Sequence, residues 1–181
     1  MTMRLSERLQ GLEKIGRVNP HVATVVEIRQ HLDDAKDLLT DASKKNNTLR
    51  GRFGNANSAA HALLMAAIKM HGYRPTGEKG HRYILYELLD ALLPGAGGAK
   101  AVLSQAHKLR NRAEYDGDPI DVTQGLVDDL VWAVANVQEE AVIMFKAFEH
   151  KNQASKRPSA APQRPRSKTL NGKPAIPTRK R

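Results

Sequence analysis

Residues 121–150 read DVTQGLVDDLVWAVANVQEEAVIMFKAFEH, and their apolar pattern predicts a helical protein. Apolar side chains recur three and four positions apart over three heptads, which is the spacing of one face of an α-helix. Such a face packs against neighbouring helices in a bundle. Asp121, followed by Gln124, is expected to form a capping pair in front of this helix. The apolar face consists of Val127, Leu130, Val134, Val137, Ala141, Met144 and Phe148.

Shorter helical patterns precede this helix, and no segment alternates polar and apolar residues over the length of a useful β-strand. The sequence therefore predicts an all-α, up-and-down bundle of five to six helices over residues 1–150, followed by a tail. Caps, prolines and glycines set its expected boundaries. The expected helix starts are Ser6, Asn19 with Pro20, and Asn57 or Ser58; the expected connections are residues 44–54, 73–80 and 94–98; the expected stops are Gly72 and Gly117.

The tail, residues 151–181, differs from the rest of the chain in composition. Residues 1–150 contain 19 Lys and Arg against 19 Asp and Glu, so this part is neutral. Residues 151–181 contain ten Lys and Arg, five Pro and no acidic residue, and they account for the entire net charge of +10. Because the tail has few large apolar side chains, it cannot bury enough surface to order itself. We expect it to be disordered.

Two interpretations of the tail remain open. Lys and Arg attract phosphates and release counterions, which gives salt-dependent affinity for nucleic acid without sequence choice. The same composition also fits a solubilising extension. The candidate nucleic-acid contacts are Lys156, Arg157, Arg164, Arg166, Lys168, Arg179, Lys180 and Arg181.

Several classes of site are excluded by what the sequence lacks. With no cysteine there is no disulfide and no thiolate site. No phosphate-binding glycine loop, zinc-protease motif or serine-hydrolase motif is present, and the histidines show no metal-ligand spacing, so no metal or cofactor is expected. The first residues lack the apolar core of a secretory signal, and residues 62–68 are too short an apolar run to cross a bilayer. We expect a cytoplasmic protein without membrane contact.

A polar cluster, Leu-Arg-Asn-Arg-Ala-Glu-Tyr-Asp-Gly at residues 109–117, ends the expected fifth helix. If Val102, Ala106, Leu109 and Ala113 form the buried seam of that helix, Asn111 points directly away from the core. His107, Glu114 and Tyr115 would then flank Asn111 on the outward side. The cluster can be a solvated helix end, with Arg110 and Glu114 paired one turn apart. Alternatively, it forms a second surface, which could be a site, a dimer contact or both.

The pattern Leu-Arg-Asn-Arg-x-Glu-Tyr-x-Gly, ahead of one long helix and about thirty residues after Gly80-His81, resembles the HEPN superfamily over roughly residues 55–150. These small helical bundles are common in prokaryotic toxin and defence systems. The resemblance implies an RNA-interacting protein, a homodimer in which two motifs share one cleft, and an antitoxin as a possible partner. It also implies metal-independent endoribonuclease activity if the site is active.

HEPN ribonucleases use an Arg, a polar neighbour and a His four to six positions after the Arg. By position, Arg110 matches the arginine and Asn111 the polar neighbour, but Tyr115 stands where the histidine is expected. A phenol, with an ordinary pKa of about 10, is a poor base at neutral pH. The resemblance therefore assigns proton donation to Tyr115, orientation to Asn111, and phosphate binding with charge stabilisation to Arg110 and Arg112. His107 and Glu114 are expected to lie nearby and contact substrate.

Two other functions fit the same residues. In the first, the chain is a non-catalytic, dimeric interaction protein whose cluster locks the dimer and whose tail binds nucleic acid or an acidic partner. In the second, the tail is a DNA-binding arm on a structural bundle. Neither requires the motif histidine.

Overall fold

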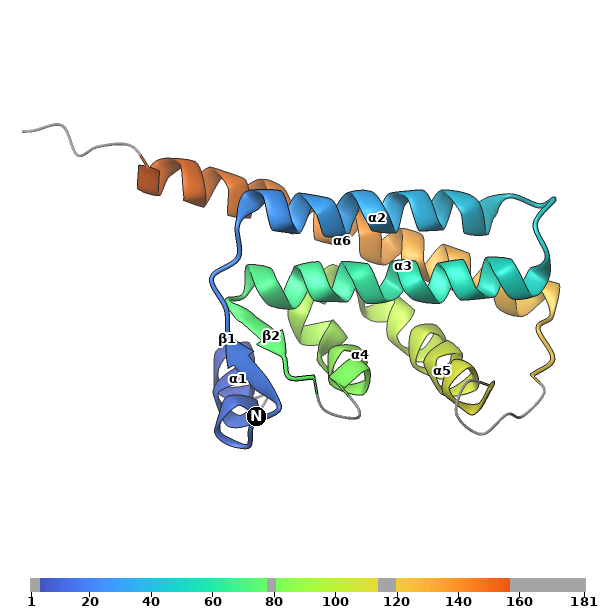
Figure 1. The fold of residues 1–181 in the computed structure, drawn as a ribbon, viewed down its shortest axis with the longest axis horizontal. Helices are drawn as coiled ribbons and strands as arrows, with labels where there is room; N and C mark the ends of the chain where they lie inside the picture. The colour runs from blue at the N-terminus through green and yellow to red at the C-terminus, as the bar shows by residue number, and fades with distance from the viewer. Residues whose placement is uncertain (1–3, 78–80, 114–119, 157–181) are drawn as a thin grey trace, which may run out of the picture.

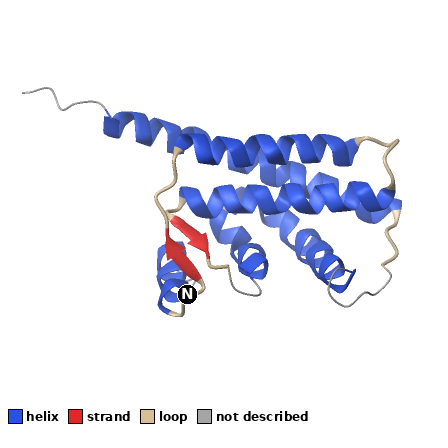
Figure 2. Cartoon of the chain, viewed as in Figure 1, coloured by secondary structure: helices blue, strands red, loops and turns tan. Residues whose placement is uncertain are grey.

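The computed structural model describes residues 4–77, 81–113 and 120–156, which form a bundle of helices (Figure 1). Helix dominates these residues, and strand is confined to one short pair (Figure 2). The predicted all-α fold is confirmed, with six α-helices in the described ranges. They are α1 (Leu5–Lys14), α2 (Val25–Ser43), α3 (Leu49–Met70), α4 (His81–Leu92), α5 (Lys100–Asn111) and α6 (Gln124–Lys156), with a 3-10 turn η1 (Pro94–Ala99) between α4 and α5.

The long axis of the molecule follows α2, α3 and α6. Residues 44–48 join α2 to α3, which run antiparallel, and α6 lies behind both in the view of Figure 1. The central helix is α3, because it contacts α2, α4, α5 and α6. Its Leu63, Leu64 and Ile68 side chains are fully buried. A helix that is apolar on nearly all sides can only be stable in such a position.

Two short strands, β1 (Val18–Pro20) and β2 (Tyr73–Pro75), pair antiparallel. The expected helix start at Asn19 and Pro20 is therefore wrong, since these residues lie in β1. The helix begins later, where the Thr24 side chain accepts a hydrogen bond from the Glu27 amide at 3.1 Å. Gly72 stops α3 as predicted, with φ of 85°, a conformation that favours glycine. A strand of three residues is too short to produce a recognisable alternation in the sequence.

The third helix also begins earlier than predicted. Residues 49–54 are helical rather than part of a loop, because Thr48 caps α3 and accepts from the Gly51 amide at 3.2 Å. Asn57 is buried inside this helix and donates to the Phe53 carbonyl at 2.9 Å, so it is not a cap. Burial of the first turns of α3 offsets the cost of their glycines.

The predicted long helix is confirmed as α6. Val127, Leu130, Val134, Val137 and Ala141 are fully buried, while Met144 and Phe148 pack against the core. Its cap differs from the prediction. The Thr123 hydroxyl accepts from the Leu126 amide at 3.3 Å, and the Gln124 side chain donates to Asp128 instead of pairing with Asp121.

At its other end, α6 continues to Lys156, past the expected boundary at residue 150. The predicted disorder of residues 151–156, including the candidate contact Lys156, is therefore wrong, because these residues continue α6. The rest of the predicted tail, from Arg157 onward, and the predicted stop at Gly117 lie outside the described ranges. No helix in the described part of the chain is both long and apolar enough to cross a membrane.

Arg52 links three helices at one end of the bundle, although only 3% of it is exposed. Its Nε donates to the Ala42 carbonyl near the end of α2 at 2.7 Å, and its Nη2 donates to Asp128 in α6 at 3.0 Å. A buried carbonyl without a donor is costly, and the arginine stem itself fills space.

We therefore expect Arg52→Ala to lower the free energy of unfolding by about 2–3 kcal/mol. Arg50→Ala, an exposed arginine in the same turn, serves as the control and should change it by less than about 0.5 kcal/mol. Urea denaturation of both variants measures the difference. Equal stabilities would show that Arg52 does not hold the three helices together.

Candidate functional site

The polar cluster at the end of α5 is placed differently from the prediction. The residues of α5 that are buried are Leu103, Ala106 and His107, while Val102 and Leu109 are only partly buried. The outward position predicted for His107 is therefore wrong. Its ring stacks on Tyr86 of α4, with centroids 4.5 Å apart and planes 19° apart. The side of α5 that faces the core is therefore the one that carries Leu103, Ala106 and His107, and Leu109 lies at its edge.

Asn111 does not point straight into solvent either. It is half-buried, and its Nδ2 donates to Nε2 of His107 at 3.1 Å. A ring nitrogen that accepts a hydrogen bond carries no proton, so His107 holds the Asn111 amide in a fixed orientation. The structure thus brings together two of the predicted site residues, one buried and one at the surface.

Three cationic side chains accompany this pair near the end of α5. Arg110 is half-buried, whereas Lys108 and Arg112 are exposed. Arg110 follows His107 by three positions and therefore shares its side of the helix. Cations at a helix C-terminus are favoured by the backbone dipole, and they also provide a place for an anion. Glu114 and Tyr115 lie outside the described residues.

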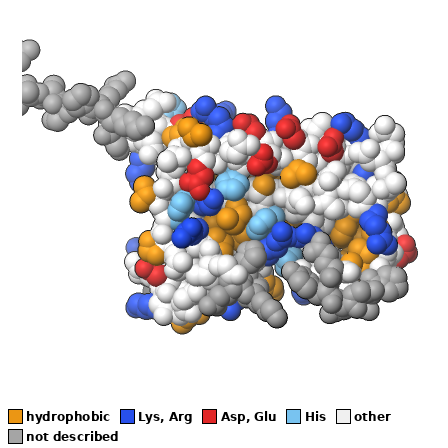
Figure 3. Space-filling view, viewed as in Figure 1, with side chains coloured by type: hydrophobic (Ala, Val, Ile, Leu, Met, Phe, Trp, Pro, Cys, Tyr) orange, Lys and Arg blue, Asp and Glu red, His pale blue; other side chains and the backbone are white. Residues whose placement is uncertain are grey.

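Figure 3 shows histidine and Lys or Arg side chains gathered in a band on one face, over α3 and toward α4 and α5. Part of this band is a network that the sequence analysis did not single out. The Lys69 ammonium donates to Glu27 at 2.7 Å and lies 2.8 Å from Nε2 of His31. The Nε2 of His21 lies 3.0 Å from both Glu27 oxygens. Glu27 and His31 lie one turn apart on α2, but Lys69 comes from α3, 42 positions after Glu27, so no local spacing reveals its place in the network.

The network perturbs two titrations. Burial raises the pKa of Glu27, but the hydrogen bonds from Lys69 and His21 outweigh it and lower that pKa to about 2. Burial, together with the Lys69 charge, lowers the pKa of His31 from its ordinary 6.5. Both shifts act in the same direction on stability, because in both cases the unfolded chain binds protons more readily than the folded one.

Stability should therefore fall in two stages as the pH is lowered. Below pH 6.5 the free energy of unfolding begins to fall, because His31 binds a proton more readily in the unfolded chain. The stabilisation that ionised Glu27 provides is then lost between pH 4.5 and about 2. Because Glu27 is partly exposed and screened by solvent, Glu27→Gln should lower the free energy of unfolding at pH 7 by only about 1 kcal/mol. The variant should lose the second stage and show a deeper first stage, because the Glu27 charge raises the pKa of His31. Urea unfolding across pH measures both stages. Asp33→Asn, at an exposed position of α2, should keep both stages.

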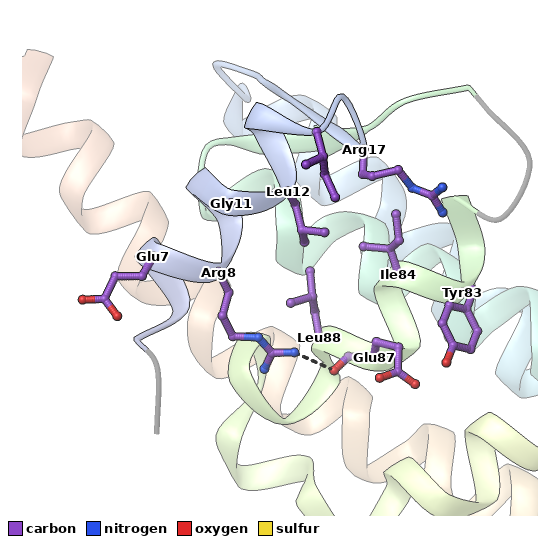
Figure 4. Close-up of a pocket in the computed structure, with 10 residues that line it drawn as sticks. Glu7, Arg8, Gly11, Leu12, Arg17, Tyr83, Ile84, Glu87 and Leu88 are labelled. Carbon is purple, nitrogen blue, oxygen red and sulfur yellow. Dashed lines mark hydrogen bonds between the residues drawn. The ribbon is translucent and has the colours of Figure 1, made fainter. Parts of the chain in front are cut away.

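An apolar cavity of about 530 Å³ lies between α1 and α4 (Figure 4). Leu12, Ile84 and Leu88 line it, and Arg8 donates to the Glu87 carbonyl at 3.4 Å at its edge. Its lining offers apolar contact and few polar groups, so it suits an apolar side chain better than a nucleotide. Among the described residues, no group of three or more His, Asp or Glu side chains is placed to hold a metal ion.

Comparisons with known proteins identified no relative of this chain. No family model matches the chain, and no significant match to a curated protein or to a solved structure was found. The HEPN resemblance therefore stays a prediction.

Proposed function

We propose that this protein binds RNA at the C-terminal end of α5, as a HEPN-type component of a prokaryotic toxin or defence system. The observation that carries the proposal is the His107–Asn111 hydrogen bond beside the cationic last turn of α5. A buried, stacked histidine that fixes a polar amide at the surface preorganises a site, and preorganised polar groups are typical of phosphate and ribose recognition.

The roles follow from the chemistry of the groups. Arg110 and Arg112 bind the phosphate and stabilise its developing charge, and Asn111 orients it. In metal-independent cleavage the 2′-oxygen attacks the phosphorus, Tyr115 donates a proton to the leaving 5′-oxygen, and bulk water takes the proton of the 2′-hydroxyl. His107 acts on the substrate only through Asn111, because its Nε2 is already engaged. This makes it a positioning residue and replaces the direct substrate contact expected from the sequence.

The engaged Nε2 of His107 also favours a second candidate function. A metal-independent cleavage needs a group that removes the proton of the 2′-hydroxyl, and α5 presents no exposed imidazole in its described residues. In this alternative the protein is a non-catalytic, dimeric interaction protein. The cationic end of α5 then forms part of the dimer contact.

Incubation of a labelled single-stranded RNA with the protein and a chelator separates the two functions. We expect cleavage that Arg110→Ala reduces by about 100-fold or more, the effect typical of losing one charge-stabilising group. Arg50→Ala, an exposed arginine at the start of α3, is the control and should leave cleavage unchanged.

Binding and assembly are measured on the same variants by fluorescence anisotropy and sedimentation. RNA binding without cleavage, together with an Arg110→Ala variant that changes only its oligomeric state, would establish the non-catalytic alternative. Absence of both binding and cleavage would overturn the proposed function.

A further inference from the structure

A second cavity, of about 330 Å³, lies where η1 meets α6, away from the end of α5. Its chemistry differs from that of the apolar cavity, because Trp132, Asn136, Glu139 and Glu140 of α6 line one side and glycines of η1 the other. The Trp132 side chain is 57% exposed, an unusual state for the largest apolar side chain. The cavity therefore combines an open aromatic ring with two carboxylates.

Neither carboxylate is neutralised by the ion pairs formed within the described part of the chain, which involve other acids. Two adjacent negative charges beside an open indole ring attract a cation by ordinary electrostatics and by the ring quadrupole. Arginine is the side chain that most often binds a tryptophan face in this way. The cavity thus fits a guanidinium group.

The glycines of η1 are part of this arrangement. A Cβ at Gly95 would overlap the carboxylate of Glu140, so only glycine allows that carboxylate to lie directly on the turn. A Cβ at Gly98 would meet the Trp132 ring at 3.9 Å, whereas one at Gly97 would meet nothing within 4 Å. The cavity therefore requires glycine at position 95, whereas a side chain at position 97 would not alter it.

We propose that this cavity binds an arginine at the end of the same chain, Arg179 or Arg181. The charge balance supports this occupant, since all excess positive charge of the protein lies in its last residues. The length of chain that follows α6 also supports this occupant. Trp132 and Lys156 both lie in α6, 24 residues apart, which is about 36 Å of helix. The 23 residues from Lys156 to Arg179 span up to roughly 75 Å, so Arg179 and Arg181 can both reach the cavity, whereas Arg157 follows Lys156 directly and cannot.

Trp132 is the only tryptophan of the chain, so quenching of its fluorescence by acrylamide reports on this cavity alone. In the full-length protein we expect R179Q/R181Q to raise the quenching constant at least twofold, because the indole loses its cover. E139Q/E140Q should raise it equally, and the combined variant should add nothing further. K151Q/R157Q removes the same number of charges from residues that do not reach Trp132 and is the matched control.

Gly95→Ala moves the Glu140 carboxylate without removing its charge, so it should also raise the quenching constant, while Gly97→Ala should not. Unchanged quenching in R179Q/R181Q would overturn the proposal. So would shielding that disappears on dilution, since the cation would then come from another copy. The proposal does not depend on RNA binding, because no arm of this experiment contains RNA.

Discussion

Replacing the eight Lys and Arg of residues 157–181 with glutamine is expected to weaken binding of single-stranded RNA by roughly 100-fold at low salt. Each cation near a phosphate releases counterions, and the slope of log affinity against log salt is about −0.7 for each phosphate neutralised on a single strand. The slope should therefore become shallower by up to roughly 5 units. The residues replaced are Arg157, Arg164, Arg166, Lys168, Lys173, Arg179, Lys180 and Arg181.

The measurement is fluorescence anisotropy of a labelled RNA over a series of salt concentrations. Arg110→Ala in the otherwise unchanged chain is the counterpart, and it should keep most of the salt dependence while losing cleavage. If the glutamine variant keeps the original slope, the tail is a solubilising extension and RNA is held by the folded part alone.

Replacing Leu64 with alanine is expected to lower the free energy of unfolding by about 3–4 kcal/mol. Leu64 has no exposed surface and lies in α3, the helix that contacts α2, α4, α5 and α6. Truncation therefore leaves a cavity that surrounding helices cannot all move to fill, and the cavity adds to the lost transfer free energy.

Urea denaturation gives this difference directly. Ile143→Ala, at a position that is 61% exposed on α6, removes a similar side chain without opening a cavity and should change the free energy by less than about 0.5 kcal/mol. Similar losses in the two variants would mean that α3 is not the centre of the core.

The candidate site could be predicted only in part. The sequence located a polar cluster near the end of the fifth helix, because Asn, Arg and His are conspicuous in an otherwise apolar pattern. It could not predict that His107 faces inward, since Val102, Ala106, Leu109 and Ala113 form the more apolar seam of this helix. The stacking partner of His107, Tyr86, lies on another helix, so the sequence of α5 does not reveal the contact.

The same limit applies to the network around Glu27 and to the cavity at Trp132. Lys69 follows Glu27 by 42 positions, and η1 precedes Trp132 by more than thirty. Contacts between residues so far apart produce no repeating pattern in the sequence that could predict them. Both exist because tertiary packing brings segments that are distant in sequence into contact, α2 with α3 and η1 with α6.

By itself, the sequence determined the helical class, the long final helix and the separation of a neutral body from a basic tail. Periodicity over three heptads and charge balance are properties of the chain that need no partner. Only the tertiary structure decided where α2 and α3 begin, which side of α5 is buried and which charges meet. Those outcomes depend on burial against other helices, whose free energy exceeds the small local preferences of caps and glycines.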